Sequence, residues 1–320
     1  MATKKLGTST VEVPALCFGT TTLGDMPNTY GYSVDGARAK ATIEAIFDGP
    51  HKFLDSSRNY GAGRSEERVG KVIRERGGLP EGVVISTKLD RDMETRRFDA
   101  ARARRSLEES LNALDLDRVQ LLHLHDPEHA IDLDEITGKD GAIAELFKMK
   151  EEGLCDAVGL AAGRTDIMIP MLQDWDFDAL ITHNRYTLIN RHAEPMMDLA
   201  VERNIAVLNA APYAGGVFAK GSSEHRRYVY QEADDAMLEP VRQIEAICAR
   251  HQVPLGALAL QFSMRDPRVT STICGVSKPE RVQQTLGWAN WAIEDDVWQE
   301  IAALPYSTDD PEATRVYQPD

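Results

Sequence analysis

The chain has 320 residues, of which 42% are hydrophobic, so it is long enough to bury a substantial core. Its 36 basic and 51 acidic residues leave a formal net charge of −15, which repels phosphate backbones and anionic lipid surfaces. We therefore expect neither a nucleic-acid partner nor a membrane partner.

The sequence contains no run of about 18 apolar residues, and its first residues lack the apolar segment of a signal peptide. A cytoplasmic location is the expectation that follows. The four cysteines, Cys17, Cys155, Cys248 and Cys274, are far apart and form no Cys-x-x-Cys motif. This spacing favours reduced thiols over a disulfide framework or a zinc site.

In chain order, a short alternating segment around Gly7 predicts an N-terminal capping hairpin over residues 5–13. From residue 15 onward, apolar strands alternate with segments of helical periodicity, which is the pattern of βα units and a parallel sheet. Eight strands are expected, at 15–20, 52–57, 83–89, 118–125, 157–162, 179–184, 206–211 and 269–275. Helices between them include 37–47, 66–76, 98–113, 143–152 and 238–251. Eight units without a linker predict one (β/α)8 TIM barrel domain over residues 1–320, with a doubly wound α/β sheet as the alternative.

The longest irregular segment is expected at residues 212–236, after the seventh strand. A loop of this length at the active face of a barrel is more often functional than idle. The tail after Pro305, which carries Tyr306 and Tyr317, is expected to fold over the same face.

Polar side chains lie at the carboxyl ends of three consecutive strands. Asp55 ends the second strand and Tyr60 follows it, while Lys88 and His125 end the third and fourth strands. Each residue alone has a structural interpretation, namely an ion pair for Asp55 with Lys88 and a satisfied core histidine for His125. A free tyrosine titrates near ~10, so a tyrosine that exchanges protons near neutral pH needs a neighbouring cation or hydrogen bond. The four residues together therefore predict an acid–base site at one end of the barrel.

These segments resemble the aldo-keto reductase family along nearly the whole chain. The resemblance rests on Phe53-Leu54-Asp55 through Tyr60-Gly61, Ser65-Glu66, Ser86-Thr87-Lys88 and His125-Asp126-Pro127. It implies a (β/α)8 barrel with NAD or NADP across its mouth and hydride exchange with a carbonyl or alcohol carbon. It also implies that Tyr60 is the proton donor in reduction, that Lys88 lowers the pKa of its phenol, that Asp55 holds Lys88, and that His125 orients the substrate oxygen.

Cofactor contacts are expected after the seventh and eighth strands, where barrels commonly bind phosphate. Gly215 and Gly216 permit a close backbone approach, and the segment Gly275-Val276-Ser277 opens a helix that carries Arg281. Ser277 and Glu280 alternatively form a capping box. The resemblance assigns further cofactor contacts to Gly19, Thr20, His183 and Gln284.

The sequence departs from the family pattern at several cofactor positions. Ala161-Ala162 stands where Ser-Asn is common, His183 where glutamine is common, and Gly275 where many members have a lysine for the 2′-phosphate of NADP. An aromatic residue that often stacks on nicotinamide is replaced near Ala210. A preference for NADP over NAD is therefore not indicated.

Two short segments, Asn184-Arg185-Tyr186-Thr187-Leu188 and Ala210-Ala211-Pro212-Tyr213, resemble the sugar-oxidising branch that includes L-fucose dehydrogenase and D-threo-aldose 1-dehydrogenase. A small carbonyl or sugar substrate is implied, bound in a pocket with Tyr30, Tyr60 and His125. We expect a monomer or a small homo-oligomer.

Two other functions remain open at this stage. In a metal-dependent barrel hydrolase, His123 and His125 would face the same way from one strand, with Asp126, Glu128, His129 and His183 nearby. This alternative leaves Tyr60 and Lys88 without a role, and we expect no metal site. A non-catalytic barrel that only senses its cofactor is the second alternative.

Overall fold

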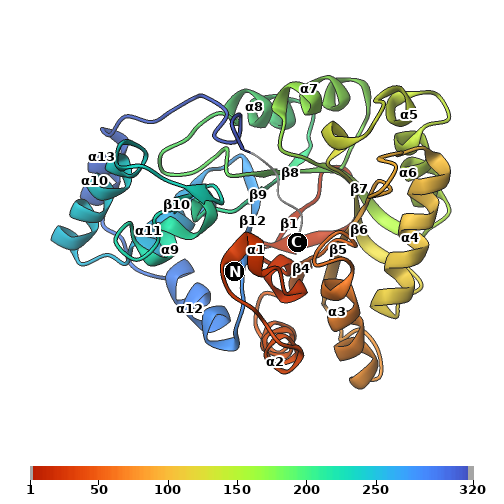
Figure 1. Cartoon of the computed structure of the whole chain (residues 1–320), viewed down its shortest axis with the longest axis horizontal. Coiled ribbons are helices and arrows are strands. Elements are labelled where there is room, and N and C mark those ends of the chain that lie inside the picture. The colour runs from red at the N-terminus through yellow and green to blue at the C-terminus, as the bar shows by residue number, and fades with distance from the viewer. Residues whose placement is uncertain (1–2, 316–320) are drawn as a thin grey trace.

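The computed structural model describes residues 3–315, and within them eight parallel strands close into a barrel surrounded by helices (Figure 1). Each strand pairs with the next in the sequence, and the last, β12, pairs with both β9 and β3. This closure excludes the doubly wound sheet and confirms the predicted (β/α)8 barrel. The strands are β3 (Leu16–Gly19), β4 (Phe53–Asp55), β5 (Val84–Leu89), β6 (Val119–His125), β7 (Cys155–Ala161), β8 (Ala179–His183), β9 (Ala206–Ala210) and β12 (Val269–Gly275).

The helices between these strands bury one face against the barrel, and aspartates cap the first turn of several of them. The carboxylates of Asp35, Asp99 and Asp234 accept hydrogen bonds from backbone N–H groups at the start of the helices that follow. The outer helices are α2 (Gly36–Phe47), α3 (Arg64–Glu75), α4 (Ala100–Leu114), α6 (Ala142–Glu151), α7 (Thr165–Asp174), α8 (Glu194–Glu202), α11 (Leu255–Arg265) and α12 (Pro279–Ala289). Two further helices, α10 (Asp235–His251) and α13 (Asp295–Ala302), pack beside α11 and α10 respectively.

The N-terminal hairpin closes the amino-terminal end of the barrel, as predicted. Its strands, β1 (Thr3–Lys5) and β2 (Glu12–Pro14), pair antiparallel, and the Lys4 ammonium donates to the carbonyl of Val269 at 2.7 Å, where β12 begins. Leu6 and Val13 are fully buried in a cluster with Phe53 of β4. Each buried aliphatic side chain stabilises this closure by roughly 1.5–3 kcal/mol. The open end of the barrel is therefore the carboxyl-terminal one.

The interior contains all four cysteines as free, buried thiols. Over residues 3–315, none of the helices is long and apolar enough to cross a bilayer.

The segment 212–236 is more ordered than the sequence pattern indicated. It contains η3 (Ala214–Gly216), α9 (Val217–Lys220) and a small hairpin of β10 (Arg227–Tyr228) and β11 (Gln231–Glu232). The Val229 N–H donates to the Ala214 carbonyl at 3.1 Å, so this hairpin is attached to the turn that follows β9.

The tail crosses the open end of the barrel over part of its length. The Asn184 amide donates to Glu312 at 2.9 Å, and Arg315 lines the cavity there. Tyr306 instead packs on Arg191 and is absent from the lining of that cavity, and Tyr317 lies outside the described residues. The tail prediction is therefore confirmed for the segment near Glu312 and Arg315, while Tyr306 packs on the loop after β8, outside the cavity.

Candidate active site

A cavity of about 490 Å³ opens at the carboxyl ends of the barrel strands. Its wall includes the last residue of β3, β4, β6, β7, β8, β9 and β12, together with Lys88 near the end of β5. The four residues that the sequence brought forward, Asp55, Tyr60, Lys88 and His125, all line this one cavity.

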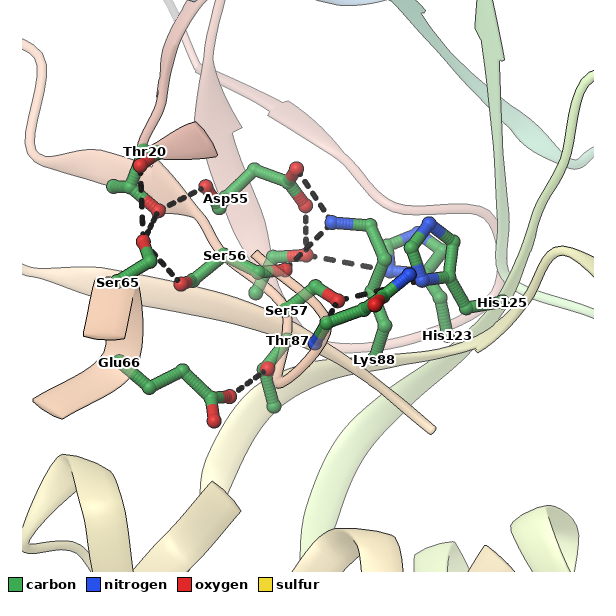
Figure 2. Close-up of polar contacts among 12 residues, drawn as sticks. Thr20, Asp55, Ser56, Ser57, Ser65, Glu66, Thr87, Lys88, His123 and His125 are labelled. Atoms are coloured by element: carbon green, nitrogen blue, oxygen red, sulfur yellow. Dashed lines mark hydrogen bonds and ion pairs between the residues drawn. The ribbon is translucent and has the colours of Figure 1, made fainter. Parts of the chain in front are cut away.

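Asp55 and Lys88 form a buried ion pair on adjacent strands (Figure 2). The Lys88 ammonium donates to Asp55 Oδ2 at 2.7 Å and to the Ser56 carbonyl at 2.6 Å, and the Ser86 hydroxyl donates to Asp55 Oδ1 at 2.8 Å. Burial alone would lower the pKa of Lys88, but Asp55 and Tyr60 together hold that pKa above its usual range. Lys88 is therefore a permanent cation beneath Tyr60.

The loop after β4 places Tyr60 over this cation. The Lys88 ammonium lies 4.7 Å from the centroid of the Tyr60 ring. Gly61 follows with a φ of +61°, and a Cβ there would lie 2.0 Å from the Gly24 carbonyl oxygen, so only glycine lets the loop pack this closely.

The ionisation of Tyr60 differs from the expectation. Burial raises the pKa of Tyr60 to about 12, although Lys88 acts in the lowering direction. The predicted cation is present, but its effect is smaller than the cost of burying a phenolate. Tyr60 is accordingly a protonated phenol at neutral pH and can donate that proton.

His125 lies beside Tyr60, and Asp90 contacts its imidazole ring. The two rings meet edge to face, with centroids 6.0 Å apart, and His125 Nδ1 lies 2.6 Å from Asp90 Oδ1. Burial lowers the pKa of His125, but the carboxylates of Asp126 and Asp90 outweigh it, so the net shift is upward. Sequence reasoning missed Asp90, and the only signal was an acidic residue two positions after Lys88.

The residues of the hydrolase alternative are not gathered at one point. His123 is buried on β6, where burial and the nearby charge of Lys88 hold its pKa well below the usual range. Glu128 instead accepts the N–H groups of Gly163 and Arg164, and His183 Nε2 pairs with Glu312. Among residues 3–315, no group of three or more His, Cys, Asp or Glu side chains is placed to hold a metal ion.

Of the nine residues expected at the cofactor, seven line the cavity: Gly19, His183, Gly215, Gly216, Gly275, Ser277 and Arg281. The other two lie outside its wall. Thr20 is fully buried and its hydroxyl donates to the Asp55 carbonyl at 3.0 Å, so it supports the end of β4. Gln284 accepts a hydrogen bond from the Arg281 guanidinium on α12.

The capping-box interpretation of Ser277 is wrong. Lys278, one residue later, is the N-cap of α12, and no side chain caps this helix. The Ser277 carbonyl instead accepts from Arg38 Nε at 2.7 Å. The reason is that Pro279 begins the helix, as proline favours the first helical position.

Besides Lys88 and Arg315, which are paired with Asp55 and Glu312, four further cations line the cavity: Arg38, Lys220, Lys278 and Arg281. Of these, sequence reasoning assigned a cofactor role only to Arg281; Lys278 lies three residues before it, while Arg38 and Lys220 come from distant elements. Within residues 3–315, no carboxylate lies at ion-pair distance from any of the four. Burial, followed by the charges of Arg281 and Arg227, lowers the pKa of Lys220. In a chain of net charge −15, these four cations without carboxylate partners give this part of the wall a positive charge that suits an anionic group.

Residues 15–305 match the model of the aldo/keto reductase family. The chain belongs to this family. As an aldo-keto reductase it is an oxidoreductase that acts on small carbonyl substrates. The family match leaves the metal-dependent hydrolase without support.

Named relatives of this aldo-keto reductase include two dehydrogenases. D-threo-aldose 1-dehydrogenase of Pseudomonas sp is 29% identical over 319 residues, covering 91% of this chain and 94% of that protein. Pyridoxal 4-dehydrogenase of Microbacterium luteolum is 28% identical over 333 residues, covering 92% and 95%. Among solved structures, an aldo-keto reductase from Bacillus halodurans in its holo form superposes with a TM-score of 0.78, over 99% of this chain and 100% of that one. At 21% identity the last likeness supports the barrel fold alone.

The tail of this aldo-keto reductase occupies one side of the cavity mouth. Glu312 lies 3.1 Å from His183 Nε2 and 3.2 Å from Arg185. Burial would raise the pKa of the Glu312 carboxyl, but these two partners hold that pKa well below the usual range. Arg315 pairs with Glu312 at 2.6 Å and lies over the Tyr230 ring. His183 thus already has a carboxylate partner at the position where the family often has a glutamine.

Proposed function

We propose that this protein is an NAD(P)-dependent oxidoreductase that exchanges hydride between nicotinamide and the C1 carbon of an aldose or a related aldehyde. One observation carries the proposal: the protonated phenol of Tyr60, over the buried Lys88 cation, lines the same cavity as four unpaired cations. The first feature suits proton exchange with a carbonyl oxygen, and the second suits the phosphates of a dinucleotide.

The cavity wall fits such a cofactor. Gly215 has a φ of +76°, and a Cβ there would lie 2.7 Å from the Tyr230 backbone nitrogen, so only glycine lets this turn of the cavity wall pack so closely on the neighbouring hairpin. Nothing lies within 4 Å of a Cβ built on Gly275, which leaves open space beside the end of β12. The phosphates would contact these glycines, Ser277 and the cations Arg38, Lys278 and Arg281. NAD and NADP both remain candidates, because this cluster would also accept a 2′-phosphate.

Tyr60 and His125 handle the proton in this proposal. In reduction, Tyr60 donates its proton to the carbonyl oxygen as that oxygen gains charge, and Lys88 stabilises the phenolate that remains. In oxidation the same step runs in reverse, and the phenolate form of Tyr60 beside Lys88 accepts the proton of the alcohol. His125 Nε2, on the side of the ring opposite the Asp90 contact, hydrogen-bonds the substrate oxygen and orients it.

The wall around Tyr60 supports a sugar as the substrate. Tyr30 and Tyr230 line the cavity with ring centroids 6.0 Å apart at 90°, and they offer faces on which a sugar ring can stack. Asn59, Asp126 and Arg315 supply polar groups for hydroxyls in the same cavity. The 29% identity to D-threo-aldose 1-dehydrogenase adds support for an aldose.

The test is a panel of aldoses, simple aldehydes and pyridoxal, assayed with NAD and NADP in both directions, beside thermal unfolding with each cofactor. We expect a rise in melting temperature with cofactor and the highest kcat/KM with an aldose. If saturating NAD and NADP both leave the melting curve unchanged, the oxidoreductase proposal fails. Cofactor binding without turnover on the whole panel would instead support the non-catalytic barrel.

A further inference from the structure

Asp90 is a buried carboxylate whose side chain contacts both His125 and the loop that carries Tyr60. It directly follows β5 and is 2% exposed. Its Oδ1 atom contacts His125 Nδ1 at 2.6 Å, and its Oδ2 atom accepts from the Ser57 hydroxyl at 2.8 Å and from the Asn59 N–H at 3.0 Å. One carboxylate therefore joins the imidazole of β6 to the loop that carries Tyr60.

The backbone of Asp90 is itself fixed on α4. Its N–H donates to the Ser106 hydroxyl at 2.8 Å, and its carbonyl accepts from Arg102 Nε at 2.9 Å. The side chain of Asp90 thus starts from a rigid point, and it transmits that rigidity to His125 and to Asn59, the residue before Tyr60.

The contacts determine which imidazole nitrogen bears the proton. Burial would raise the pKa of Asp90, but His125 and the hydrogen bonds from the Tyr60 loop lower it, so the carboxylate is ionised and can only accept. His125 Nδ1 must then be the donor. Nε2 lies 3.6 Å from Asp126 Oδ2 and is the nitrogen left for the cavity, and it donates to a substrate oxygen in the cationic form of the ring, in which both nitrogens are donors. The groups that face this pair are Lys88 from β5, His123 and Asp126 on and after β6, Glu66 from α3 and Tyr60.

We propose that Asp90 is a positioning residue of this active site: it fixes the tautomer, charge and orientation of His125 and holds the Tyr60 loop in register with it. This inference rests on the proposed function, because it assumes that His125 Nε2 and the Tyr60 hydroxyl meet one substrate oxygen. The arrangement follows the general rule that a base is oriented by a third group behind it.

Asp90→Asn in the full chain is the direct test. An asparagine has one acceptor oxygen and cannot serve both the imidazole and the loop. We expect kcat for carbonyl reduction to fall about 10- to 100-fold with little change in cofactor affinity, as for other groups that orient a reacting residue. The alkaline limit of the pH profile should also move to lower pH, because the His125 cation loses its carboxylate.

Ser57→Ala is the matched control. It removes the hydrogen bond from the Ser57 hydroxyl to Asp90 and the 3.4 Å contact of that hydroxyl with His125 Nδ1, but it keeps the 2.6 Å contact between Asp90 and His125. The alkaline limit of the profile should therefore move much less than in Asp90→Asn. If Asp90→Asn lowers stability and kcat but leaves the pH profile where it is, Asp90 is merely structural and the proposal is overturned.

NMR titration of His125, assigned with His125→Asn, separates this proposal from the proposed function because it needs no turnover. In the parent protein His125 should titrate above the ordinary value of ~6.5, and in Asp90→Asn at a lower pH than in the parent. The parent measurement stands even if Asp90→Asn does not fold. A His125 pKa at or below the ordinary value in the parent refutes the role of Asp90. Failure of the substrate and cofactor panel with a raised His125 pKa refutes only the oxidoreductase proposal.

Discussion

Lys88→Met removes the cation of the buried ion pair and keeps most of the side-chain volume. Lys88 and Asp55 are 1% and 4% exposed, and their charges are 2.7 Å apart. Breaking a buried pair by removing one partner costs about 3–5 kcal/mol, since the remaining carboxylate is left without compensation. At roughly 2.1 cal/mol/K per residue, the unfolding entropy of 320 residues is about 0.7 kcal/mol/K near 60 °C. The melting temperature should therefore fall by about 4–7 °C.

Lys88→Met should also lower turnover, by an amount comparable in free energy to its effect on stability. Tyr60 already has a pKa of about 12 with Lys88 in place, and loss of the cation moves it further upward. The developing phenolate then has no counter-charge, so turnover should fall by about 10²- to 10⁴-fold. Steady-state kinetics at saturating cofactor measures this loss, and cofactor-induced thermal shifts show whether binding is retained.

The double variant Asp55→Asn with Lys88→Met separates the two effects. Both charges are gone, and the side-chain amide that replaces the carboxylate can still accept the hydrogen bond from Ser86, so most of the lost melting temperature should return. Turnover should stay low. Recovery of near-parent activity in the double variant would refute the catalytic role of Lys88 and leave it as a structural partner of Asp55.

Three further predictions follow from the same geometry. Tyr60→Phe keeps the ring contacts with Lys88 and His125, so it should fold and bind cofactor but lose about 10²- to 10⁴-fold in kcat; near-full activity with weaker cofactor binding would make Tyr60 a wall residue only. Burial raises the pKa of Glu66 from 4.5 to about 7, so the folded state holds this proton more tightly than the unfolded chain, and stability is lost as pH rises through that range. Glu66→Gln should therefore be more stable than the parent at pH ~8, by up to about 3 kcal/mol, and should have no advantage near pH ~4. Urea unfolding at the two pH values measures this difference, and a stability advantage that does not depend on pH would contradict the prediction. Because Gly275 replaces the lysine of many relatives, NAD should serve at least as well as NADP; a strong NADP preference abolished by Arg281→Ala, measured as kcat/KM, would show that one arginine suffices.

The strands and the four site residues could be predicted because each depends on local pattern. An apolar run that ends in a charged residue marks a strand and its carboxyl end, and closure of the barrel brings those ends together. Asp55, Lys88 and His125 needed only this rule. The strand expected at 52–57 is shorter in the structure, since β4 ends at Asp55. Beyond it, the Ser56 carbonyl and Ser57 hydroxyl leave the sheet to bind Lys88 and Asp90.

Residues that reach the site from distant elements could not be predicted in this way. Arg38 lies on α2, yet it joins the wall through the Ser277 carbonyl, 239 residues later. Glu312 in the tail likewise contacts His183 of β8. The path of the tail is fixed by tertiary contacts, such as the hydrogen bond from the Ser307 N–H to the Ile189 carbonyl at 2.9 Å. The periodicity of the sequence does not indicate these long-range contacts.

The ionisation of Tyr60 could be predicted only in part from the sequence motif. The motif correctly indicated a cation beneath the phenol, but a pKa depends on every neighbour and on burial. The positive charge of Lys88 is paired with the Asp55 carboxylate. Likewise, the ionised Asp90 carboxylate pairs with His125, whose pKa is raised. Lys88 still acts in the lowering direction on the pKa of Tyr60, but Asp55 opposes it and burial has the larger effect. Tyr60 is therefore protonated in the resting site, which suits proton donation to a carbonyl oxygen.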